Sequence, residues 1–184
     1  VGLKNLPLYF QTVRKLLRPG GVFLNHGIAR SSGYAGNASF LDRAVVPFLY
    51  DAFHLGCPRR SSFIDKYVFP DGELVTLSQA LQAAESAGFE VRDVENLREH
   101  YMLTLRHWIR RLENNHEQAT NLVTEADYRA WRIYMSGSAH SFKVGYLNLF
   151  QTLMVKPDAN GASNMPLTRA DWYEHSLPGS DTIL

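Results

Sequence analysis

Apolar and polar residues follow two different spacings along the chain, and these spacings predict its helices and strands. Four segments place apolar residues every three or four positions and are predicted as amphipathic helices: 5–18, 76–88, about 101–114 and about 125–142. Three shorter apolar or alternating runs are predicted as strands: 22–25, 89–97 and 146–156. Strands that alternate with helices in this order are typical of an open α/β sheet.

The boundaries of two helices carry recognisable capping residues. Thr76 is followed three residues later by Gln79, which is the spacing of a capping box, and Gly88 stands where a helix C-terminus needs a residue with positive φ. Thr124 is predicted as the N-cap of the last long helix.

The first helix and the first strand are joined by a short break. Pro19-Gly20-Gly21 ends the helix and Val22 begins an apolar run at once, so we expect a helix followed by a buried strand with cover on both faces. The apolar positions of the helix predict its buried side: Leu6, Phe10, Val13, Leu16 and Leu17.

A long segment interrupts the regular pattern. We predict an insertion at about 29–75 within a domain formed by 1–157, followed by a linker and mobile tail at 158–184 in which Trp172 and Tyr173 are the residues able to dock. The insertion begins with Gly, Ser and Asn and continues with four spaced aromatic residues: Phe40, Phe48, Tyr50 and Phe53. Aromatic clusters of this kind form either plain core or the lining of a ligand cavity.

Composition narrows the functional classes. The 184 residues, 45% of them hydrophobic, suffice for one folded domain, and a net charge of +1 lacks the basic excess that nucleic-acid binding needs. No apolar run reaches the ~20 residues of a membrane span. The single cysteine, Cys57, excludes an internal disulfide and a zinc site built on several cysteines, and we interpret it as structural rather than nucleophilic. No metal is expected.

Four stretches together resemble the cyclopropane-fatty-acyl-phospholipid synthases and mycolic acid cyclopropane synthases over about residues 1–157. They are Leu17-Arg18-Pro19-Gly20-Gly21 with His26-Gly27-Ile28; the segment 63–70; Asp93-Val94-Glu95-Asn96-Leu97 with His100-Tyr101 and Thr104-Leu105; and Gly145-Tyr146 with Gln151. The first stretch is common to many cofactor-dependent methyltransferases. The second and third, in this order, are specific to the family.

The resemblance implies a fold and a reaction. The fold would be the C-terminal half of a Rossmann-like, seven-stranded methyltransferase sheet with an inserted helical region that covers lipid. The reaction would transfer a methyl group from S-adenosylmethionine to the double bond of an unsaturated phospholipid acyl chain, with loss of a proton and closure of a cyclopropane ring. Some relatives stop at methylation.

By resemblance, three residues would hold a bicarbonate ion that acts as the base. His26 would bind it through its ring, Ile28 through its backbone and Tyr101 through its hydroxyl. Gly27 departs from the threonine of several relatives, which loosens this loop. Asp65 and Lys66 would shape the acyl entrance or the fold.

Two family features are absent from the sequence. Gly33-Tyr34-Ala35-Gly36 does not follow a strand and open a helix, so it is not the family's Gly-rich cofactor loop. The glutamate with which the family binds bicarbonate would lie before Val1.

We therefore expect that this chain is the C-terminal portion of a longer enzyme and is inactive alone. The enzyme would be cytoplasmic, peripherally associated with a membrane and able to form a homo-oligomer. A non-enzymatic module that binds acyl lipid or a partner, and a methyltransferase of the same fold with another small acceptor, remain alternatives.

Overall fold

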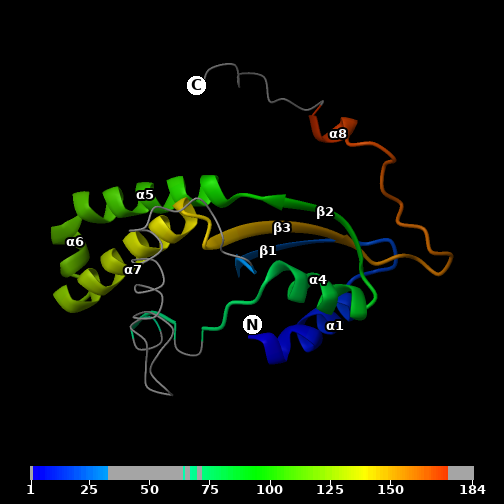
Figure 1. The fold of residues 1–184 in the computed structure, drawn as a ribbon, viewed down its shortest axis with the longest axis horizontal. Coiled ribbons are helices and arrows are strands. Elements are labelled where there is room, and N and C mark those ends of the chain that lie inside the picture. The colour runs from blue at the N-terminus through cyan, green and yellow to red at the C-terminus, as the bar shows by residue number, and fades with distance from the viewer. Residues whose placement is uncertain (1, 33–63, 65–66, 70–71, 174–184) are drawn as a thin grey trace.

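The computed structural model describes residues 2–32, 64, 67–69 and 72–173 (Figure 1). Its elements, in chain order, are η1 Leu3–Asn5, α1 Leu6–Leu16, β1 Val22–Arg30, α4 Leu77–Ser86, β2 Glu90–Asn96, α5 Arg98–Asn114, α6 His116–Thr120, α7 Glu125–Lys143, β3 Leu147–Val155 and α8 Ala170–Tyr173. The predictions for the insertion fall outside the described residues: Gly33, Gly36, Phe40, Phe48, Tyr50, Phe53, Cys57, Asp65 and Lys66.

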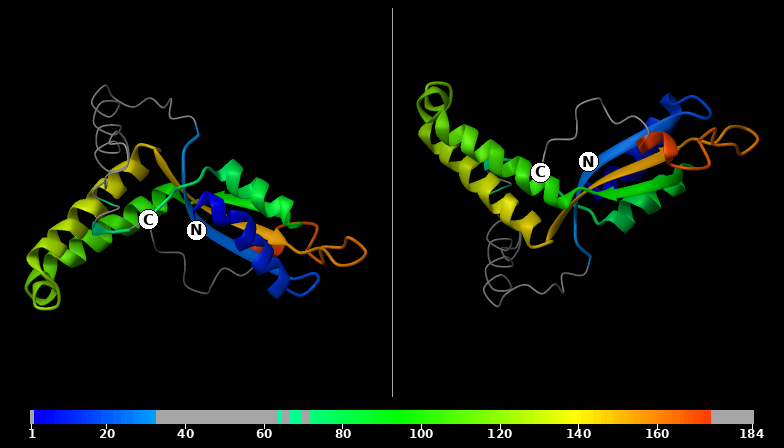
Figure 2. Two further views of the ribbon diagram at one scale, coloured as in Figure 1. Left: turned by 90° about the horizontal axis from the view of Figure 1, so that it is seen from below. Right: turned by 90° about the horizontal axis from the view of Figure 1, so that it is seen from above.

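The three strands form one sheet in the order β1-β3-β2. The central strand β3 runs antiparallel to both neighbours, so β1 and β2 point the same way (Figures 1 and 2). The strand predicted at 22–25 extends to Arg30, five residues beyond the apolar run. Its pairing with β3 continues through Asn25 and His26, where the run of apolar residues stops.

Helices α1 and α4 pack on one side of the sheet, which we call the covered face. Phe10, Phe89 and Met154 are at most 4% exposed there. The Phe89 ring centroid lies 6.4 Å from that of Phe10 and 6.0 Å from that of Phe23 of β1. This aromatic layer holds both helices against the strands.

The capping box predicted for α4 is confirmed. The backbone N–H of Gln79 donates to the Thr76 hydroxyl at 3.3 Å, and the Thr76 N–H donates to the Gln79 side chain at 2.9 Å. Gly88 follows the helix with a φ of +88°, as its predicted place at the C-terminus requires. Local sequence therefore sets both ends of this helix.

The turn predicted between α1 and β1 is held in place by hydrogen bonds with Lys156, the residue that follows β3. The Lys156 ammonium donates to the carbonyls of Arg14 and Leu17 at 2.9 and 2.8 Å, which satisfies two C-terminal carbonyls of the helix. The Gly20 N–H donates to the Lys156 carbonyl at 2.7 Å, and Gly20 has a φ of +70°. A non-glycine residue would be strained at this turn.

Helices α5 and α7 form a hairpin that projects beyond the end of the sheet (Figure 2). Leu105, Phe142 and Leu149 are buried where the hairpin joins β3. The Arg98 guanidinium, at the start of α5, donates to the carbonyls of Phe142 and Lys143, both at 2.8 Å, and so closes the end of α7. Trp108 is 45% exposed, although its ring makes an edge-to-face contact with that of Tyr101.

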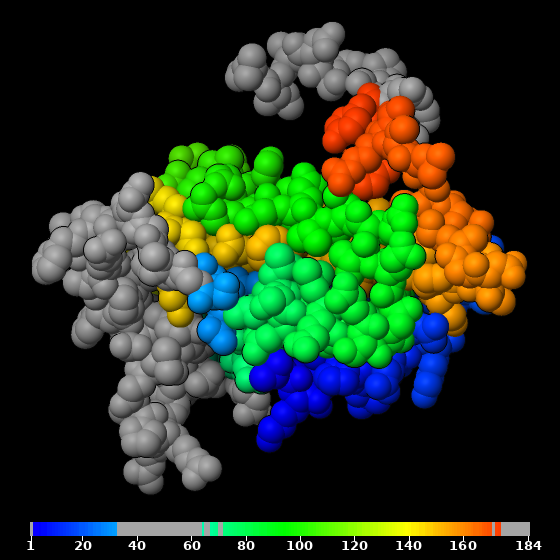
Figure 3. Space-filling view, turned by 45° about the vertical axis from the view of Figure 1, so that its right-hand side comes forward, coloured from blue at the N-terminus to red at the C-terminus, as the bar shows by residue number. Residues whose placement is uncertain are grey.

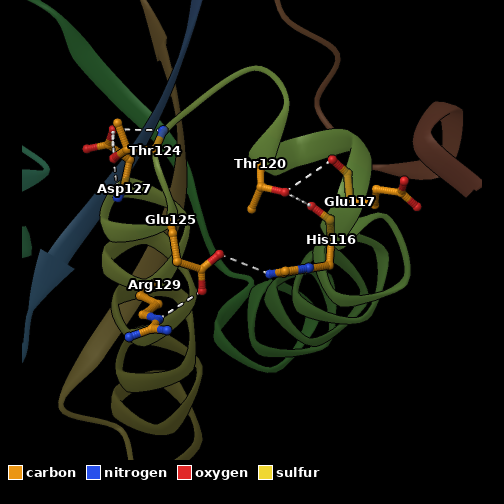
Figure 4. Close-up of polar contacts among 7 residues, drawn as sticks. All are labelled: His116, Glu117, Thr120, Thr124, Glu125, Asp127 and Arg129. Carbon is orange, nitrogen blue, oxygen red and sulfur yellow. Dashed lines mark hydrogen bonds and ion pairs between the residues drawn. The ribbon is translucent and has the colours of Figure 1, made fainter.

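The tip of the hairpin is held by exposed polar contacts (Figure 4). Thr124 is the N-cap of α7, as predicted, and forms a capping box with Asp127. The Glu125 carboxylate accepts from Arg129 at 2.9 Å and lies 3.1 Å from the His116 ring. The hydrogen bond from Arg129 is the main cause that lowers the pKa of Glu125.

The opposite side of the sheet, which we call the open face, is covered less completely. Val22 and Leu24 of β1 are 46% and 50% exposed there, so the expectation of a strand covered on both faces is wrong within the described residues. Among the described helices, those laid along β1 are α1 and α4, both on the covered face (Figure 2). The prediction also fails for Leu16, which is 84% exposed at the end of α1.

The segment after β3 returns over the open face and borders a hollow of about 390 Å³. Met165 and Trp172 line this hollow together with residues of all three strands: Val22, Leu24, Asp93, Glu95, Gln151 and Leu153. Arg169 forms an ion pair with Asp93 and lies 5.3 Å from the Trp172 ring centroid. Figure 3 shows the orange and red atoms of this segment on the green surface that includes β2. Trp172 thus lines the hollow but remains 43% exposed, and Tyr173 is 71% exposed.

Candidate functional site

His26 lies on the open face of β1, directly opposite Gln151 of β3. Its ring Nδ1 is 3.3 Å from the Gln151 side-chain nitrogen Nε2. The His26 side chain is otherwise exposed, so the ring presents its second nitrogen to the surroundings. Its position in the strand is fixed by pairing on β3, although the local sequence is polar.

Ile28 follows two residues later on the same face, opposite Leu149. Its side chain packs against the core at the base of the hairpin. The Arg30 N–H donates outward to the Val75 carbonyl at 3.1 Å, whereas the Ser31 N–H donates to Tyr146, next to β3. Because hydrogen bonding alternates along an antiparallel pair, the Ile28 N–H also points away from β3, toward the outer edge of β1.

Tyr101 lies in the first turn of α5 and is half-buried. Its ring centroid is 5.0 Å from that of Phe142, in an edge-to-face contact. Burial raises the pKa of the Tyr101 phenol above its ordinary 10.0, and the nearby Tyr134 raises it further. The phenol therefore keeps its proton at neutral pH and can donate a hydrogen bond.

The three residues predicted for the site occur where the sheet meets the hairpin. Ile28 and Tyr101 pack against the same buried cluster, and His26 is one side-chain position away from Ile28 along β1. Among the contacts of the described residues, none joins His26 directly to Tyr101. A ring N–H, a backbone N–H and a phenol are all donors, so the set fits an anion better than a cation. No group of three or more metal-ligating residues occurs within the described ranges.

Gln151 is a polar residue of this region for which the sequence-based prediction names no role. It stands between Leu149 and Leu153 on one face of a strand that is otherwise largely apolar. That interruption is a usable signal, because a polar side chain on the inner strand of a sheet needs a partner.

The described residues do not fit the binding site expected for S-adenosylmethionine. In such sites a strand leads through a Gly-rich turn into a helix whose N-terminus faces the ligand. Here Gly20 and Gly21 precede β1, and β2 continues into α5 through Leu97 without a glycine. No described helix is long and apolar enough to cross a membrane.

Comparisons with known proteins agree on one family. The profile of mycolic acid cyclopropane synthetase matches residues 1–152. A probable fatty acid methyltransferase of Pseudomonas putida is 42% identical over 173 residues, which is 94% of this chain and 39% of that protein. The probable fatty acid methyltransferase Rv3720 of Mycobacterium tuberculosis is 33% identical over 178 residues, or 95% of this chain and 35% of that protein.

Solved structures give the same result for the fold. The mycolic acid cyclopropane synthase CmaA1 complexed with SAH and CTAB superposes with a TM-score of 0.69 at 27% identity. The superposition covers 83% of this chain and 50% of that structure. The chain therefore spans about half of this solved structure and less than two fifths of the two curated relatives.

Proposed function

Because the chain belongs to the mycolic acid cyclopropane synthetase family of S-adenosylmethionine-dependent methyltransferases, we propose that it serves methyl transfer to the double bond of an unsaturated phospholipid acyl chain. The product is a cyclopropane or methyl-branched fatty acid. The observation that carries this proposal is the donor set at the junction of sheet and hairpin: His26, Ile28 and Tyr101.

The proposed role of these donors is to hold a bicarbonate ion. The outward N–H of Ile28 and the protonated phenol of Tyr101 are suited to oxygen atoms of an anion. His26 adds a ring N–H from its side chain on the open face of the same strand. Bound there, bicarbonate would accept a proton at the reaction centre. A fixed anion also favours the positive charge that alkene methylation creates, which is the electrostatic part of the catalysis.

Apolar packing around two of the donors, Ile28 and Tyr101, supports the same chemistry. Tyr101 contacts the rings of Phe142 and Trp108, and the buried Leu149 lies opposite Ile28. Such surroundings keep water away from a carbocation, which water would otherwise trap.

We further infer that the cofactor is held by parts of the enzyme beyond the described residues, so that this chain alone is inactive. Calorimetric titration of the chain with S-adenosylmethionine tests this inference. We expect no heat of binding at micromolar concentrations. Tight binding by the chain alone would contradict it.

The catalytic proposal is best tested in a chimera. The matching segment of the Pseudomonas putida relative is replaced by this chain, and the purified chimera is incubated with S-adenosylmethionine and unsaturated phospholipid. Mass spectrometry of the acyl chains should show the added mass of one CH₂. A folded chimera that binds the cofactor but leaves the acyl chains unchanged would reject the lipid assignment and favour another acceptor.

Variants of the chimera test the residues. His26→Ala and Tyr101→Phe should each lower the rate about 100-fold or more, as expected for groups that support proton transfer. Tyr9→Phe is the matched control, because the pKa of Tyr9 is also raised by burial but its hydroxyl donates to Asn25 on the covered face. If Tyr9→Phe lowers the rate as much as His26→Ala and Tyr101→Phe do, the donor set has no special role in catalysis.

We also infer that the substrate is met at a membrane surface, in the cytoplasm. The hairpin exposes six large apolar side chains: Leu103, Trp108, Leu122, Val123, Trp131 and Ile133. Sedimentation of the chain with vesicles of unsaturated phosphatidylcholine, with and without anionic lipid, tests this surface. Leu122→Asp should weaken sedimentation, whereas Leu16→Asp, equally exposed on α1, is the control.

We also propose that the enzyme can form a homo-oligomer. Analytical ultracentrifugation in the same buffer tests this proposal.

One observation favours a second candidate, a binding module without catalysis. The hollow on the open face has an apolar floor formed by Val22, Leu24 and Leu153. If the chain alone binds an unsaturated fatty acid and Leu24→Asp abolishes that binding, the module is supported. If the chain alone does not bind the fatty acid, the binding module is rejected and the catalytic proposal stands.

A further inference from the structure

His26 and Gln151 are partners in a particular class of cross-strand pair. Hydrogen bonds join Ser31 to Tyr146 and Lys156 to Gly21, on either side of the β1 and β3 pairing, while the Arg30 N–H points outward. By alternation, the pair His26 and Gln151 exchanges no backbone hydrogen bonds. In such pairs the side chains approach most closely. The contact between the two side chains is therefore imposed by the register of the sheet.

The chemistry of the amide gives this contact a direction. The Gln151 Nε2 lies 3.3 Å from Nδ1 of His26, and an amide nitrogen only donates. Nδ1 must then accept, so it carries no proton. In a neutral imidazole the single proton is on the other nitrogen, Nε2. The ring is left with an N–H donor on the side away from Gln151.

We propose that Gln151 is a positioning residue that holds His26 in the Nε2–H tautomer, so that the ring donates a hydrogen bond to the bound anion. The inference rests on the proposed function for the identity of the anion. Gln151 is suited to this role because β3 is the inner strand, paired on both sides, which fixes the amide more firmly than an edge strand would. The hydrogen bond made by one ring nitrogen commonly sets the tautomer of a functional histidine.

The tautomer can be measured directly in the isolated chain. In ¹⁵N-labelled protein, at a pH where histidine is neutral, long-range ¹H–¹⁵N spectra distinguish a protonated from an unprotonated ring nitrogen. His26→Asn assigns the signals among the seven histidines. We expect Nδ1 of His26 to be unprotonated and Nε2 to be protonated. The reverse would mean that the amide oxygen faces the ring, and would overturn the proposal.

Two substitutions of Gln151 test the cause. A carboxylate only accepts, so Gln151→Glu should move the ring proton to Nδ1, and Gln151→Leu should give a mixture of tautomers. Asn148→Leu is the matched control, because it removes a cross-strand amide contact to Asn96 on the covered face of the same strand. If the His26 signals do not change in either Gln151 variant, the residue does not position the ring.

These spectra do not depend on activity, so a failure of the proposed function would leave them intact. In the chimera, Gln151→Leu should lower the rate about 10- to 100-fold, the range known for partners that orient a functional histidine. In a His26→Ala background the same substitution should cost nothing more, because its effect passes through the ring. A full additional loss there would show that Gln151 acts elsewhere.

Discussion

The covered and open faces of the sheet are built from the same three strands but differ in what protects them. On the covered face, two helices bury Phe10, Phe89 and Met154 almost completely. On the open face, Val22 and Leu24 remain about half exposed beneath a short returning segment. The covered face is therefore closed along the whole of β1, whereas the open face is buried only toward the hairpin, where Ile28 packs near Leu149.

Strand alternation separates these two tasks along β1. Phe23 packs into the aromatic layer of the covered face, while Leu24, His26 and Ile28 point to the open face. Phe23 therefore holds the fold, whereas the exposed side chains of Leu24 and His26 are available for function; Ile28 packs its side chain into the core near the hairpin and offers its backbone N–H. The difference between the faces can be tested by substitutions of each kind.

The largest effect is expected inside the covered face. Phe10→Ala should lower the free energy of unfolding by about 3–5 kcal/mol, because it leaves a cavity in a packed aromatic layer. Leu24→Ala on the open face should cost about 1 kcal/mol or less, since half of that side chain is already in water. Urea unfolding followed by circular dichroism measures both. Equal losses would remove the distinction between the faces.

A smaller effect is expected at the N-terminus of α4, beneath the covered face. Thr76→Ala removes the capping box and should cost about 1 kcal/mol. Thr124→Ala removes the corresponding box at the hairpin tip, where the cap is exposed, and should cost less. The same unfolding experiment compares the two caps. A larger loss of unfolding free energy in Thr124→Ala would show that the cap at the hairpin tip stabilises the fold more than the cap beneath the covered face.

On the open face, the ion pair between Asp93 and Arg169 should contribute little stability but hold the returning segment in place. Asp93→Asn should cost at most about 1 kcal/mol, as is usual for partly exposed pairs. The indole N–H signal of Trp172 should shift and exchange faster with solvent. Glu90→Gln, which removes the pair with Arg92 on the same strand, is the control. An unchanged Trp172 signal would show that apolar contacts alone hold the segment.

The smallest effect is expected at the solvent-exposed tip of the hairpin. The pKa of Glu125 is lowered in the folded chain, so its contribution to stability is present above the ordinary value of 4.5 and is lost as the pH falls through the folded value. Glu125→Gln should therefore slightly reduce the difference in urea midpoint between pH 7 and pH 3. Glu117→Gln, exposed on α6, is the control. An effect comparable to that of Phe10→Ala would contradict the assignment of stability to the covered face.

Much of the local structure is predictable from the sequence because it depends on local physics. The helices follow from apolar spacing, and their starts follow from Thr76 and Thr124, whose partners are three residues away. The extent of β1 was not predictable, because its second half contains Asn25 and His26 and is held by β3, more than a hundred residues later. The same distance explains why the order of the strands could not be obtained from periodicity.

The candidate site shows the same division. His26, Ile28 and Tyr101 were identified by resemblance to a family, and no local pattern would have selected Ile28, whose relevant atom is a backbone N–H. The contact of Gln151 with His26 depends on the register of two strands, which a single sequence does not contain. The exposure of Leu16 was also unpredictable, because it depends on where the neighbouring elements end.

The position of β3 between β1 and β2 has a consequence for how the chain is made. Both outer strands leave the ribosome before β3, and among the described strands each pairs with β3, the strand that comes last, and not with the other. The three-stranded sheet of the described residues is therefore incomplete in nascent chains, which carry Phe23 and Phe89, until Val155 has been synthesised. Because contacts so distant in sequence form slowly, we expect assembly in one late step after synthesis, with a preceding interval in which chaperones have access to the unpaired strands.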